Sequence, residues 1–168
     1  MVMVMVLHVR HFMFLFLSEP TKPLTLQSQV VPNNATVQIG KYKISTSQLL
    51  GSKNAQILYL RLPESSTFYG QGYQAYGKET LKKLYSTDIS GITTTDGKNT
   101  YTLTELKDLV ATILRFRRAK DIRVLDYADS FSATDDDDVQ LEHADRVASA
   151  KLVVDVVKEE KIPGTIKA

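Results

Sequence analysis

The chain has 168 residues, of which 43% are apolar and 24% are charged, and its formal net charge is +2. These values are ordinary for a globular protein with a core of its own, and no basic block supports nucleic-acid binding. The absence of cysteine excludes disulfides, thiolate metal ligands and a cysteine nucleophile. With only three histidines, a zinc site built on several imidazoles would be short of ligands.

The first 17 residues are apolar but are interrupted by His8, Arg10 and His11. The uninterrupted run Phe12 to Leu17 is too short to cross a bilayer, which takes about 20 residues. Three interpretations stay open: an atypical signal peptide with Arg10 as its charged flank, a buried pair of strands, or a misplaced start.

A polar stretch with three prolines, residues 18–34, is typical of a linker or surface loop. The alternating pattern of packed strands begins at Ala35. We therefore divide the chain into an apolar N-terminal segment with a linker over 1–34, an α/β domain over 35–160 and a tail over 161–168.

Strand and helix patterns alternate through the middle of the chain. In chain order they predict a hairpin over 37–44, a buried strand over 55–62, a short helix over 79–85, a helix over 102–118, a strand over 122–125 and a helix over 142–160. The helix over 102–118 has the clearest start, because Thr102 and Glu105 fit a capping box. This order is an α/β layout, for which we expect a mostly parallel sheet.

In a parallel sheet, ligands bind at the carboxyl ends of the strands. Asp126 follows the strand predicted over 122–125 and begins a polar loop of more than a dozen residues, a length that is often functional. We therefore expect Asp126 and the loop that leads to His143 to lie at the binding edge.

The stretch "TFYGQGYQAYG" is rich in glycine and tyrosine. A loop of this composition can approach a ligand closely and stack its rings on a sugar, although an irregular surface loop is the simpler interpretation. The candidate substrate-binding residues, taken with Asp126, are Tyr69, Tyr73 and Tyr76.

The stretch "DDDDVQLEHADR" precedes the last predicted helix. His143 and Arg146 are spaced i, i+3 and share one face of its first turn, with Asp145 beside them. Arginine has no free lone pair and cannot hold a metal, and Asp135 to Asp138 lack the spacing of a calcium loop. The simpler interpretation of the run is an exposed acidic segment placed favourably before a helix N-terminus.

The succession "ILYLRLP", "GQGY", "ETLKKLYSTDI", "TYTLTELKDLVATI", "IRVLD" and "EHADRVASAKLV" resembles the C-terminal part of the PIG-L/LmbE-like zinc-dependent de-N-acetylases, over residues 35–157. The resemblance implies a Rossmann-like layered α/β fold that is incomplete on its N-terminal side. It also implies removal of N-acetyl groups from sugars, as the eukaryotic namesake does on N-acetylglucosaminyl-phosphatidylinositol in glycolipid-anchor synthesis. The implied partner is an N-acetylated sugar or glycolipid, and the implied compartment is the endoplasmic reticulum or secretory pathway.

The family's metal site is not matched in this chain. Its N-terminal motif "AHPDD", which supplies two ligands and the general base, is absent, and Arg146 stands at the ligand histidine that ends "HxDH". His143 and Asp145 match the rest of that motif and are expected to be vestiges of the catalytic site. Because the family's amide hydrolysis needs zinc to polarise the carbonyl and activate water, we expect no cofactor and no deacetylase activity here.

Three functions stay open at this point. The first is an inactive relative of these de-N-acetylases that keeps sugar binding through its tyrosine loop. The second is an active member whose N-terminal part is missing from the sequence, against which Arg146 argues. The third is a non-enzymatic carbohydrate-binding or interaction domain that keeps the α/β core for stability.

Overall fold

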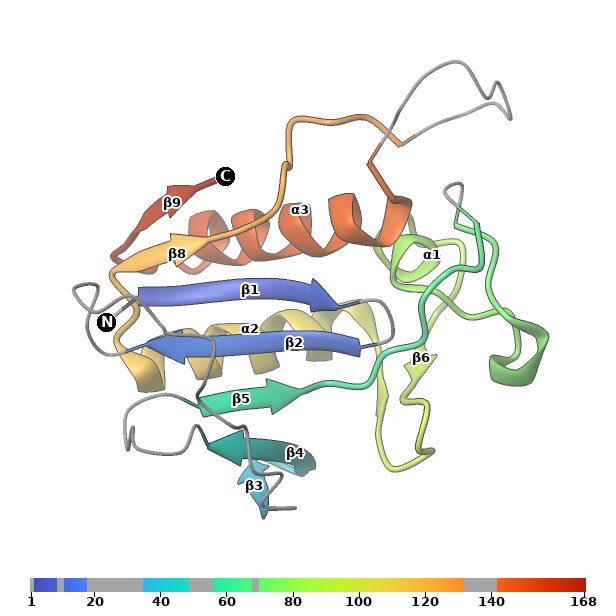
Figure 1. The fold of residues 1–168 in the computed structure, drawn as a ribbon, viewed down its shortest axis with the longest axis horizontal. Helices are drawn as coiled ribbons and strands as arrows, with labels where there is room; N and C mark the ends of the chain where they lie inside the picture. Colours follow the sequence, from blue (N-terminus) through green and yellow to red (C-terminus); the bar gives the residue numbers. More distant parts are fainter. Residues whose placement is uncertain (1, 9–10, 18–34, 49–55, 68–69, 132–141) are drawn as a thin grey trace, which may run out of the picture.

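The computed structural model describes residues 2–8, 11–17, 35–48, 56–67, 70–131 and 142–168. These residues form a mixed α/β structure in which α2 (Leu103–Arg117) and α3 (Ala144–Glu159) pack on the same face of one sheet (Figure 1). The short helix α1 (Leu81–Tyr85) lies at the end of the sheet where α3 begins (Figure 1).

The main sheet has seven strands in the order β3-β4-β5-β2-β1-β8-β9. The strands are β1 (Val2–His8), β2 (His11–Leu17), β3 (Ala35–Ile39), β4 (Tyr42–Gln48), β5 (Gln56–Tyr59), β8 (Asp121–Arg123) and β9 (Thr165–Lys167). A separate two-stranded ribbon consists of β6 (Ile92–Thr93) and β7 (Thr100–Tyr101).

The expectation of a mostly parallel sheet is wrong. Along the sheet from β3 through β4, β5 and β2 to β1, each strand is antiparallel to the next. In the described part of the chain, only β1 with β8 and β8 with β9 pair in parallel. Two residues separate β1 from β2, a connection that suits a hairpin, whereas a parallel pair needs a crossover of about a dozen residues or more. Helix α3 supplies such a crossover between β8 and β9, but these residues form no Rossmann-like parallel sheet.

The apolar N-terminal segment forms a pair of strands, as one of its three interpretations held. Strands β1 and β2 pair from Val2 with Leu17 to His8 with His11. They occupy the centre of the sheet, between β5 and β8, rather than an edge. Strand β9, from the C-terminal residues, extends the same sheet beyond β8.

The predicted capping box of α2 is confirmed. The hydroxyl of Thr102 accepts the Glu105 N–H at 3.2 Å, and the Glu105 carboxylate accepts the Thr102 N–H at 2.9 Å. The side chain of Thr80 caps α1 in the same way by accepting the Lys83 N–H. In the described part of the chain, no helix is long and apolar enough to cross a membrane.

The core lies between the sheet and the two long helices. Strands β4, β5 and β8 contribute Ile44, Leu58 and Ile122 to it. Helix α3 is buried on most of its circumference, and Ala144, Val147, Ala150, Val154 and Val157 are all buried. Such a helix is held in place by packing from several directions, so its N-terminal turn holds the side chains of His143 and Asp145 in a defined position.

Candidate functional site

The residues singled out by the sequence lie where three elements meet: the segment after β5, the start of α1 and the first turn of α3. Helix α1 packs directly against α3. The hydroxyl of Tyr85, at the end of α1, donates to Asp155 of α3 at 2.8 Å. Burial, together with this hydrogen bond, raises the pKa of Tyr85 to about 12, so the phenol stays a donor across the physiological range.

Asp145 is the centre of this junction. Its side chain is buried, with 1% of the residue exposed. One carboxylate oxygen, Oδ2, accepts the backbone N–H of Ser65 at 2.5 Å, and the other, Oδ1, accepts the backbone N–H of Lys82 at 2.8 Å. Charge-assisted hydrogen bonds of this kind contribute about 1.5–3 kcal/mol each, so Asp145 ties two remote segments to α3.

His143 is the N-cap of α3. Its Nδ1 accepts the backbone N–H of Asp145 at 3.3 Å, and its Nε2 lies 3.2 Å from the hydroxyl of Ser65. Because Nδ1 is an acceptor, the neutral ring carries its proton on Nε2. In this tautomer Nε2 donates to the hydroxyl oxygen of Ser65.

Arg146 is held by its own helix. Its Nη1 lies 3.0 Å from Oε1 of Glu142, an ion pair spaced i, i+4. The same Glu142 oxygen accepts the backbone N–H of His143 at 3.0 Å. Position 146 in the first turn of α3 is therefore occupied by a cation paired with a carboxylate.

The segment that follows Ser65 folds back on itself. Ser65 and Gly72 form an isolated antiparallel bridge. A Cβ on Gly72 would collide with the carbonyl of Lys78, so this position requires glycine. Tyr73 is the N-cap of the short 3-10 helix η1 (Gln74–Tyr76), and Tyr76, its last residue, donates its N–H to the Tyr73 carbonyl at 3.0 Å.

The two tyrosines of this turn are accessible. Tyr73 is 46% exposed and Tyr76 is 41% exposed. Both tyrosines belong to the same turn, since Tyr73 immediately precedes η1 and Tyr76 ends it. Tyr73 directly follows Gly72, whose bridge partner Ser65 contacts both His143 and Asp145.

Asp126 is not part of the described Asp145 junction. It is exposed, and its Oδ1 accepts the N–H of Ala128 at 2.8 Å, a local turn. Tyr69 and the acidic run Asp135 to Asp138 lie outside the described residues. Within the described ranges, no group of three or more histidine, cysteine, aspartate or glutamate side chains is placed to hold a metal ion.

Sequence reasoning missed three participants in the junction: Ser65, Lys82 and Glu142. Ser65 and Lys82 contribute backbone N–H groups, which every residue except proline carries, so their side chains give no signal of the role. Glu142 does have a signal, since it lies four residues before Arg146 at the start of a predicted helix.

Comparisons with known proteins add no identification. No family model, no curated protein and no solved structure matches this chain.

Proposed function

We propose that this chain is a catalytically incomplete relative of the PIG-L/LmbE-like de-N-acetylases that binds an N-acetylated sugar without hydrolysing it. The proposal combines the resemblance carried by the motifs over residues 35–157 with the geometry around Asp145. The sugar is proposed to lie on the turn that carries Tyr73 and Tyr76.

The proposed loss of catalysis rests on the missing "AHPDD" motif, and the contacts of Asp145 support it, because this residue is poorly placed to act as a substitute base. Both of its oxygens already accept backbone N–H groups, from Ser65 and Lys82. A general base must reach the attacking water, but only 1% of Asp145 is exposed, and moving either oxygen towards a water would leave a backbone donor without this partner. Nδ1 of His143 already accepts the Asp145 N–H at the start of α3. Arg146 is permanently protonated and has no free lone pair for a metal or a proton.

Sugar binding is supported by the exposed aromatic pair. The face of a pyranose ring is apolar, and an exposed tyrosine ring offers it a flat apolar surface with a polar hydroxyl at the end. The bridge between Ser65 and Gly72 fixes the base of the turn, so Tyr73 is presented from a defined backbone. A turn held in one conformation loses less entropy on binding than a free one.

The test is ligand-observed saturation-transfer NMR with N-acetylglucosamine on the wild type, Tyr73→Ala and Tyr76→Ala. We expect binding to the wild type and roughly two- to tenfold weaker binding for each variant, because a stacked ring contributes about 0.5–1.5 kcal/mol. Phe116→Ala is the matched control, since Phe116 is an exposed aromatic residue on α2, and it should bind like the wild type.

Two outcomes would overturn the proposal. Binding that is absent, or that survives both tyrosine substitutions, would exclude the tyrosine turn as a sugar site. Acetate release from N-acetylglucosamine or its phosphatidylinositol conjugate by the wild type would show that the chain is an active hydrolase.

A further inference from the structure

A surplus of basic side chains lies at one end of the molecule, where both long helices end. Residues 115–123 carry five basic side chains and one acidic side chain, and residues 158–168 carry three basic and two acidic ones. Together these two segments have a formal net charge of +5, whereas the whole chain has +2, so the remaining residues have a net charge of −3. The positive charge is therefore concentrated in residues 115–123 and 158–168, which we call the basic end.

The fold brings the two segments of the basic end together. Figure 1 shows α2 and α3 ending at the same end of the sheet, opposite to α1. Nη2 of Arg115 donates to the Glu160 carbonyl at 3.3 Å, and the Thr165 N–H donates to the Lys120 carbonyl at 2.8 Å. Because these contacts join the end of α2 to the end of α3 and to β9, the two segments form one surface.

Most of the positive charge of the basic end is not used inside the molecule. Ion pairs already occupy its three acidic side chains, which are Asp121, Glu159 and Glu160. In the described part of the chain, none of these or any other ion pair involves four exposed basic side chains of this surface, which are Arg118, Lys120, Lys158 and Lys161. Their charges are therefore available to an anionic partner outside the molecule.

Phe116 lies within this basic surface. It is 82% exposed, the largest exposed fraction of any large hydrophobic residue in the described part of the chain. The guanidinium carbon of Arg117 lies 5.9 Å from the centre of its ring. Burial of the ring against an apolar protein surface would also bury the neighbouring guanidinium group, which is costly. At a membrane interface the ring can enter the boundary of the acyl chains while the guanidinium group stays among the headgroups.

We propose that the basic end is a docking surface for a bilayer that contains anionic lipids. Phe116 enters the boundary between the headgroups and the acyl chains, and the basic side chains around it lie against the anionic headgroups. Clusters of roughly four to eight basic side chains are typical of surfaces that bind anionic lipids.

A single-stranded nucleic acid offers the same kind of charge, but the observations favour the bilayer. Proteins that bind single strands stack successive bases on several aromatic side chains along a basic groove. Of the exposed large hydrophobic residues in the described part of the chain, Phe116 alone belongs to the basic end. One exposed ring among basic side chains suits insertion into an interface better than the stacking of a strand.

The first experiment is co-sedimentation of the full chain with vesicles of phosphatidylcholine and phosphatidylserine, and with vesicles of phosphatidylcholine alone. We expect the wild type to bind the anionic vesicles far more tightly than the neutral ones, and less tightly as salt is added. Phe116→Ala should bind the anionic vesicles roughly tenfold more weakly, because it loses the burial of one ring. Lys120→Gln should bind them roughly fivefold more weakly, the contribution of one basic residue near an anionic membrane.

Two substitutions away from the basic end are the matched controls. Lys43→Gln removes the same charge from an exposed position on β4, on the far side of the sheet from β8 and β9. Tyr127→Ala removes an exposed ring beyond the other end of β8. Both should bind like the wild type. A wild type that does not bind anionic vesicles, or equal losses for Lys43→Gln and Lys120→Gln, would overturn the proposal. Tighter binding to a single-stranded oligonucleotide than to the vesicles would overturn it in favour of a nucleic acid.

The second experiment places a fluorescent reporter at the position that enters the bilayer. The chain contains no tryptophan, so Phe116→Trp gives a single tryptophan signal. We expect its emission to shift to shorter wavelength when anionic vesicles are added, because the indole leaves water, and we expect no shift for Tyr127→Trp. An unshifted emission from Phe116→Trp that sediments with the vesicles would overturn the insertion of this residue. The two experiments need no sugar, so they are independent of the proposed function.

Discussion

Asp145 is charged, buried and placed in the first turn of a helix. The helix N-terminus favours a negative charge there, and two backbone N–H groups replace the water that the carboxylate loses on burial. The sequence alone suggested a remnant of an acid–base site at this position. The structure shows that the same residue attaches α3 to the segment after β5 and to α1.

This structural function predicts a large loss of stability for Asp145→Ala. Two backbone donors lose their acceptor, so the free energy of unfolding should fall by about 2–4 kcal/mol. Asp126→Asn is the control, because its local turn tolerates asparagine, and it should change stability by about 0.5 kcal/mol or less. Urea unfolding followed by circular dichroism measures both. A loss for Asp145→Ala as small as that of the control would contradict the attachment.

Single residues also show what local patterns could predict. The capping box of Thr102 and Glu105 involves contacts three residues apart, so the sequence was sufficient to predict it. Asp145, by contrast, contacts Ser65 and Lys82, which lie 80 and 63 residues away in the sequence. No pattern within α3 names those partners, so the sequence could not predict the hydrogen bonds that attach α3 to them.

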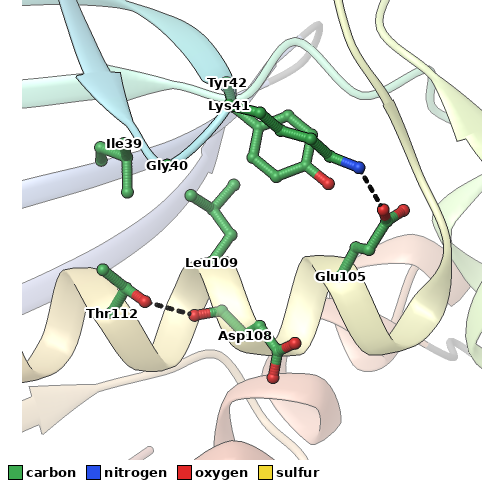
Figure 2. Close-up of a pocket in the computed structure, with 8 residues that line it drawn as sticks. All are labelled: Ile39, Gly40, Lys41, Tyr42, Glu105, Asp108, Leu109 and Thr112. Atoms are coloured by element: carbon green, nitrogen blue, oxygen red, sulfur yellow. Dashed lines mark hydrogen bonds and ion pairs between the residues drawn. The ribbon is translucent and has the colours of Figure 1, made fainter.

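At the scale of elements, one ion pair links a turn of the sheet to the start of a helix. Lys41, in the β3–β4 turn, pairs with Glu105 in the capping box of α2 (Figure 2). This contact, followed by the backbone N–H of Thr102, lowers the pKa of Glu105 to about 2 from its ordinary value of 4.5. The carboxylate therefore connects two elements that are far apart in the chain.

The lowered pKa of Glu105 gives stability a defined pH dependence. A carboxyl group whose pKa is lower in the folded state contributes stability above its unfolded pKa, and that contribution is lost as the pH falls from about 4.5 towards about 2. Glu105→Gln should therefore show a shallower fall in melting temperature than the wild type across this window. Thermal unfolding at a series of pH values checks it, with Lys41→Met expected to reduce the slope as well. Parallel curves for wild type and Glu105→Gln would contradict the prediction.

Elements with strong local signals were predicted well. The hairpin around Gly40 is confirmed, and Gly40 has a φ of 56°, which favours glycine. The strand expected over 55–62 is shorter, since β5 ends at Tyr59 and Arg61 takes a φ of 52°. Leu60 and Leu62 are nevertheless buried, so the apolar run correctly predicted core residues but not the length of the strand.

At the scale of the whole molecule, the direction of the sheet could not be predicted from the order of elements. The α/β succession at the C-terminal side does produce parallel pairs, through α3 between β8 and β9. The antiparallel part depends on where the N-terminal hairpin inserts. Strands β1 and β2 lie between β5 and β8, and that placement is set by long-range pairing, which no local pattern records.

The whole molecule also separates two surfaces. The tyrosine turn adjoins the Asp145 junction at the end of the sheet where α3 begins, whereas the basic end lies at the opposite end, where α3 ends (Figure 1).

The central claim is that the first turn of α3 is a structural junction and not a metal centre. The most direct test is the zinc content of the purified full chain, measured by elemental analysis on the wild type and on Arg146→His. We predict zinc far below one ion per chain in both, because Asp145 is committed to the backbone of Ser65 and Lys82. Stoichiometric zinc in the wild type would contradict the account, and Asp145 and His143 would then be candidate ligands.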